Sequence, residues 1–201
     1  MTALLFLSSV ALAKDGEGCA RPPAELSQTS AALYAMFAAD MADRSSHDPN
    51  TAKNDATRLS EVRRLSKDGQ ICSGLDNYHA AVVLLHSDLA ADIARAYELA
   101  VSSMNHHVPQ GPWAVANTFD RWRISRGLTQ SYGTGTGIVK GKPCMYPLDA
   151  AFTDDQRAQY DIEPVEKAIR RVLDAAGETS APATWRELEK QGMVCKVEAW
   201  K

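Results

Sequence analysis

The chain lacks the short signatures that define most enzyme and binding classes. It has no C-x-x-C pair, which argues against a zinc ribbon and a thioredoxin-type redox site. It has no G-x-S-x-G segment, so the nucleophile elbow of many hydrolases is missing. It has no apolar run long enough to span a bilayer. A net charge of −3 provides no general attraction to nucleic acid.

What remains is an ordinary globular composition. The 201 residues are 45% apolar and 23% charged, and the aromatic share is only 7%. These values exclude a disordered chain and a collagen-like fibre. The length suits one domain that can bury its own core.

The first thirteen residues follow the pattern of a secretory signal peptide. An apolar stretch over 4–12 is followed by Ala11-Leu12-Ala13, an A-x-A cleavage site, and then by polar residues. No Lys or Arg precedes the apolar stretch, which departs from the pattern. We expect a periplasmic or secreted protein. The alternative is an apolar segment that packs on the core.

The four cysteines are expected to form disulfides. They are Cys19, Cys72, Cys144 and Cys195, an even number that suits an oxidising compartment. Three pairings are possible, and the sequence does not choose among them. No metal or cofactor is expected. The glycine-rich segment 133–143 does not match a phosphate-binding P-loop, because Thr136 and Pro143 stand where Gly and Ser or Thr are required.

Helical spacing of apolar residues dominates the chain after residue 26. Residues 130–147 are rich in glycine and lack this period, which predicts one long loop with a possible short hairpin. We therefore expect a single all-α domain of six to eight helices over 27–201, after an N-terminal arm over 14–26. Helices are predicted over 27–44, 55–67, 77–85, 88–104, 113–125, 164–176 and 182–190, with a short one from Thr153.

Two histidines and an aspartate suggest a polar site at a helix break. His79 and His86 are seven residues apart and share a helix face, and Asp88 follows at the expected break. In one interpretation His86 is a general acid or base, or a ligand, and Asp88 orients it. The spacing does not match the i, i+4 pair of helical metal ligands. The alternative is a buried histidine bonded to backbone, with Asp88 as a helix cap.

A second pair, Asp120-Arg121, lies inside a predicted helix. Adjacent helical residues point in different directions, so each needs its own partner. Arg121 either pairs with an interior carboxylate or holds an anionic ligand.

Several short motifs occur in a fixed order between residues 54 and 160. They are Asn54-Asp-x-x-Arg58, Val62-Arg63-x-Leu65 with Gly69, Asp76-x-Tyr78-His79-Ala-Ala, His86-Ser-Asp88, Trp113-x-x-Ala116-x-x-x-Asp120-Arg121, Gly127-x-x-Gln130-x-Tyr132-Gly-Thr134, Pro147-Leu148 and Asp154-x-x-Arg157. This order resembles a family of uncharacterised, often exported bacterial proteins that carry a domain of unknown function. Family members usually have Gln where Gly135 stands, and residues 164–201 lie outside the resemblance.

The resemblance implies an α-helical domain without an assigned activity. It implies one candidate site formed by His86, Asp88, Asp120, Arg121, Gln130 and Tyr132, to which we add His79. Three hypotheses follow. The first is an exported binding domain for a small molecule or peptide, the second a buried hydrogen-bond network that fixes the loop, and the third a periplasmic hydrolase-like enzyme that uses His86, Asp88 and Arg121.

Overall fold

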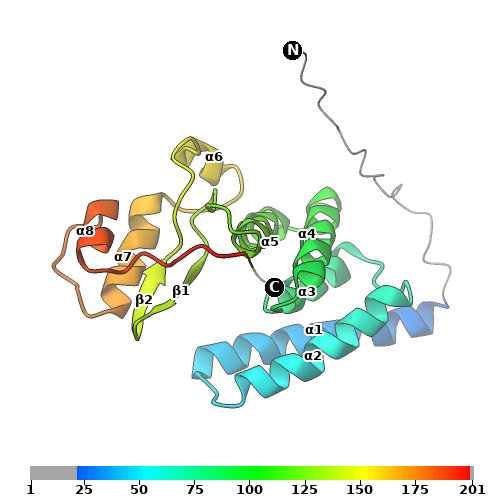
Figure 1. The fold of residues 1–201 in the computed structure, drawn as a ribbon. Coiled ribbons are helices and arrows are strands. Elements are labelled where there is room, and N and C mark those ends of the chain that lie inside the picture. Colours follow the sequence, from blue (N-terminus) through cyan, green and yellow to red (C-terminus); the bar gives the residue numbers. More distant parts are fainter. Residues whose placement is uncertain (1–21, 200–201) are drawn as a thin grey trace, which may run out of the picture.

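The computed structural model describes residues 22–199, and this part of the chain contains eight helices and one two-stranded hairpin. The prediction of a mainly helical fold is confirmed, with a small sheet in the glycine-rich segment (Figure 1). The elements are α1 (Pro23–Ser46), α2 (Thr51–Lys67), α3 (Gly74–Leu84), α4 (Ala90–Asn105), α5 (Gly111–Ser125), β1 (Thr136–Val139), β2 (Lys142–Met145), α6 (Asp154–Ala158), α7 (Val165–Ala175) and α8 (Trp185–Lys190).

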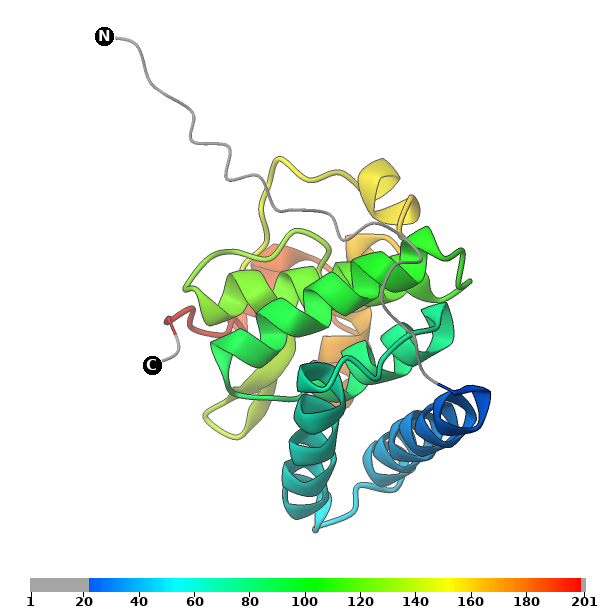
Figure 2. The same cartoon turned by 90° about the vertical axis from the view of Figure 1, so that its right-hand side faces the viewer.

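The first five helices enclose the larger apolar core. α3 lies at its centre, and every residue from Asp76 to Leu84 is buried. α4 packs against both α3 and α5, and Figure 2 shows α4 and α5 side by side. α1 and α2 form a helical hairpin beside α3 (Figures 1 and 2). The apolar, nearly charge-free sequence of α3 thus specifies a central helix.

Helix starts differ from the expected ones by a few residues. α1 begins at Pro23, inside the segment expected to be an arm, because proline is accommodated in the first turn of a helix. α3 begins after Ser73, whose hydroxyl accepts from the N–H of Asp76, while the carboxylate of Asp76 accepts from the N–H of Ser73. Asp76 therefore completes a capping box instead of being the cap itself.

A smaller apolar cluster joins β2, α7, α8 and the C-terminal tail. The tail runs from α8 past the hairpin towards α5 (Figure 1). The N–H of Met145 donates to the carbonyl of Met193, and the N–H of Cys195 donates to the carbonyl of Met145, both at 3.0 Å. The tail therefore lies along β2 as a strand-like segment.

The cysteines of the described segment are disulfide-bonded. Cys144 in β2 is joined to Cys195 in the tail, and Cys72 is likewise disulfide-bonded. Cys19 and the expected signal peptide lie outside the described residues. Within residues 22–199, no helix is long and apolar enough to cross a membrane.

Candidate functional site

His86 lies in the connection between α3 and α4, where the chain leaves one helix before starting the next. Its Nε2 lies 3.3 Å from Oδ2 of Asp40, a fully buried residue of α1. Asp88 does not fill the expected orienting role, because its side chain is 96% exposed and its carboxylate lies 3.6 Å from Nη2 of Arg121. The carboxylate that orients His86 is therefore supplied by a different helix.

Arginines from two helices hold Asp40 in place. Nη2 of Arg44 lies 3.0 Å from Oδ1 of Asp40, and Nη2 of Arg58 lies 3.7 Å from the same oxygen. Arg58 also binds Asp43 and Asp55 at 2.7 Å each. Burial raises the pKa of Asp40, but the bonds and charges of His86 and Arg44 outweigh it and hold this pKa below its usual range. Asp40 is thus a carboxylate at neutral pH.

Arg121 in α5 brings a second cation to the same place. Burial lowers the pKa of Arg121, Asp88 and Tyr146 act in the opposite sense, and the nearby charge of Arg44 lowers it further. The charge of Arg44 therefore acts on Arg121, which places the two side chains in the same region of the molecule. About 30% of each side chain is exposed, as is 27% of His86. We name Asp40, Arg44, His86, Asp88 and Arg121 the His86 cluster.

Asp120 points in a different direction from its neighbour Arg121 and is fully buried. Its carboxylate accepts hydrogen bonds from the backbone N–H groups of Ser131, Tyr132 and Thr134 at 2.7–3.1 Å, and from the Thr134 hydroxyl at 2.9 Å. Burial raises the pKa of Asp120, although these bonds act to lower it. Asp120 thus anchors the loop that follows α5.

Gln130 fixes the same loop from its other side. Its Oε1 accepts from the N–H of Gly135 at 2.6 Å, and its Nε2 donates to the carbonyls of Gly135 and Tyr146 at 3.1 and 2.7 Å. A side chain at Gly135 would clash with Ile124, which accounts for glycine here. The fully buried Gln130 therefore belongs to the loop network and not to the His86 cluster.

Tyr132 and His79 are also interior residues. The Tyr132 ring packs edge-on against Phe152 and Tyr160, with centroids 4.7 and 4.9 Å apart. His79 stacks on Phe37 at 4.8 Å. Burial lowers the pKa of His79, while the charge of Asp76 partly opposes this effect. The candidate residues therefore separate: His86 and Arg121 are partly exposed, Asp88 is almost fully exposed, and the other four are buried elsewhere.

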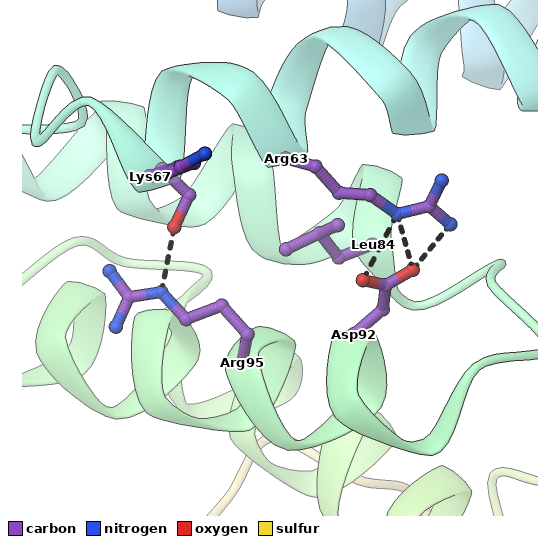
Figure 3. A pocket seen from close by; sticks show the side chains of 6 residues that line it. Arg63, Lys67, Leu84, Asp92 and Arg95 are labelled. Carbon is purple, nitrogen blue, oxygen red and sulfur yellow. Dashed lines mark hydrogen bonds and ion pairs between the residues drawn. The ribbon is translucent and has the colours of Figure 1, made fainter.

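The sequence analysis missed a groove between α2 and α4. It has a volume of about 330 Å³, and Figure 3 shows the Arg63–Asp92 pair on one side of Leu84 and Arg95 on the other. Arg63 binds both oxygens of Asp92 at 2.6–3.1 Å, and Arg95 binds Ser66 and Glu98. Because these arginines are already paired within the protein, we interpret the groove as a salt-bridged contact between helices.

Comparison with known proteins adds no further assignment. Among the described residues, no group of three or more His, Cys, Asp or Glu side chains is arranged to hold a metal ion. No known protein family matches the chain, and no significant match is found among curated proteins or solved structures.

Proposed function

We propose that this protein is an exported helical binding domain whose ligand carries a carboxylate or phosphate group held by the His86 cluster. The supporting observation is that Arg121, a mostly buried cation, lies 3.6 Å from Asp88, whose carboxylate is almost fully exposed. An exposed ion pair is weak, so an incoming anion takes the place of Asp88 at Arg121, while Arg44 stays paired with Asp40 and Asp55. The family resemblance noted from the sequence is part of this proposal, since its His-Ser-Asp and Asp-Arg motifs supply three members of the cluster.

Binding of simple anions tests this function. Inorganic phosphate and glutamate are titrated against the full chain, and chemical shifts of the Arg side-chain N–H groups are followed by NMR. We expect Arg121→Gln to weaken binding at least tenfold, because a charge-assisted bond contributes about 1.5–3 kcal/mol. Arg186→Gln, a change at an exposed arginine of α8, is the matched control and leaves binding unchanged. Equal binding by all three proteins would refute the proposal.

The contact between Asp40 and His86 favours a second candidate function. A buried carboxylate at 3.3 Å from Nε2 orients the imidazole. An imidazole held in this way can serve as a general acid or base in ester hydrolysis. The test is hydrolysis of p-nitrophenyl phosphate and p-nitrophenyl acetate by the wild-type protein and by His86→Gln. Turnover that disappears in this variant, with folding intact, supports the enzyme function, and its absence in the wild type eliminates it.

A further inference from the structure

A second groove lies between α7, α8 and the segment that joins them. Its volume is about 620 Å³, which is in the range of ligand and peptide pockets. It belongs to the smaller apolar cluster and shares no lining residue with the His86 cluster. The groove is lined by Asp154, Val165, Glu166, Ile169, Pro182, Ala183, Thr184 and Trp185.

The inner side of the groove is apolar, and hydrogen bonds hold Trp185 and the segment before Pro182 in place. Ile169 is 3% exposed and belongs to the core of the cluster, while Val165 and Ala183 pack against that core. The indole Nε1–H of Trp185 donates to Oε1 of Glu189 at 2.9 Å, which orients the ring. Arg170 donates to the carbonyls of Glu178, Thr179 and Ala181 and so holds the segment before Pro182.

The charged side chains that line the groove are acidic. Two carboxylates line it, those of Asp154 and Glu166, and no Lys, Arg or His of the described chain does so. Oδ1 of Asp154 accepts from Arg157 and from the N–H of Val165, both at 3.0 Å, and its side chain is 52% exposed. Positions in the first turns of α6 and α7 explain why acids are tolerated there. Trp185, which packs against the smaller apolar cluster, adds an indole to the same lining.

We propose that this groove binds a lysine side chain of a partner peptide. A lysine has a long aliphatic stem for the apolar walls and a terminal ammonium for Asp154 and Glu166. An indole is the strongest aromatic partner for a cation. The volume exceeds the needs of one side chain, so the groove also accommodates the residues that flank the lysine in a peptide.

Three capped tripeptides test the charge requirement of the groove. The probes are acetyl-Ala-Lys-Ala-amide, the same peptide with norleucine, which keeps the stem without the ammonium, and the same peptide with Glu. NMR follows the indole N–H signal of Trp185, assigned with the variant Trp185→Phe. We expect the lysine peptide to shift this signal and to bind at least fivefold more tightly than the norleucine peptide. Equal binding of the two, or preferential binding of the Glu peptide, would overturn the proposal.

A variant pair and a free amine complete the experiment. Glu166→Gln is expected to weaken binding of the lysine peptide about threefold, while Glu198→Gln, at an exposed acid of the tail outside the groove, leaves it unchanged. Equal losses in the two variants would contradict a specific role of the groove. n-Butylammonium distinguishes the source of the cation, because binding as tight as that of the peptide would show that the peptide is not required.

Discussion

Asp120 uses its whole carboxylate group as a hydrogen-bond acceptor inside the protein. Its two oxygens accept from three backbone N–H groups and one hydroxyl. Asp120→Asn replaces one acceptor oxygen with an NH2 group that faces these donors. We expect a loss of about 3 kcal/mol in the free energy of unfolding, measured by urea denaturation. Asp155→Asn, at an exposed acid of α6, should change it by less than about 0.5 kcal/mol. Similar values for both would contradict the anchoring role.

Asp88 competes with any anion for Arg121. The two groups are 3.6 Å apart, and the carboxylate is almost fully exposed. Because an exposed ion pair contributes at most about 1 kcal/mol, we expect Asp88→Asn to tighten binding of phosphate or glutamate by roughly two- to fivefold. The same NMR titration measures the change. Weaker binding in Asp88→Asn would mean that Asp88 helps to hold the ligand.

His79 makes stability depend on pH in a defined direction. Its pKa in the folded protein is lowered by burial from the usual value of about 6.5. The unfolded chain therefore binds a proton more readily, and the stability contributed by neutral His79 is lost as the pH falls below that value. We expect the free energy of unfolding to decrease between pH 7 and pH 5. His79→Phe, which keeps the ring contact with Phe37, should show a smaller decrease.

A matched histidine provides the control for this pH dependence. His47 is exposed and has a positive φ of 55°, a conformation that asparagine tolerates. His47→Asn should follow the pH curve of the wild type. If His79→Phe did the same, burial of His79 would not be the cause of the decrease.

Asp40 shows what a local reading of the sequence overlooks. It follows Leu33 by seven residues and Phe37 by three, which places an acid on the buried side of α1. That position was an available signal for a paired, functional carboxylate. The sequence favours Asp88 because it is near His86 along the chain, whereas the partner of His86 in the structure is Asp40, 46 residues earlier.

At the scale of elements, the helices were predictable because their determinants are local. The apolar period identified α1–α5 and α7, and Thr153 was correctly identified as the cap of α6. The pairing of Cys144 with Cys195 was not predictable, because it depends on the tail returning to β2. The sequence also does not show that Asp120 and Gln130 belong to a loop network apart from the His86 cluster. That distinction depends on which distant segments meet in the fold.

The disulfide between β2 and the tail should stabilise the smaller cluster specifically. The bonded cysteines are 51 residues apart, and a loop of this length corresponds to about 4 kcal/mol by chain entropy. We expect the double variant Cys144→Ser/Cys195→Ser to lose up to this amount. Hydrogen exchange should accelerate at Met145 and Cys195 while the amides of α3 stay protected. Uniform acceleration across both regions would show that the two cores unfold as one unit.

At the scale of the whole molecule, the two apolar clusters carry different kinds of site. The larger one presents the His86 cluster near the start of α4 and the loop after α5, and the smaller one contains the groove of Trp185. Composition and periodicity predicted a helical fold but not its division into two apolar clusters. The two clusters are similar in composition and differ only in which segments of the chain pack together.

The bond between Cys144 and Cys195 also turns part of the chain into a closed covalent ring. α6, α7 and α8 all lie between these two cysteines, so the whole wall of the Trp185 groove is carried on that ring. A protease that cuts once near the exposed residue Thr179 would open the ring without separating the pieces. Such a nicked protein should run as one band on a gel without reductant and as two bands with it. The groove would thus keep its parts together after a single cut.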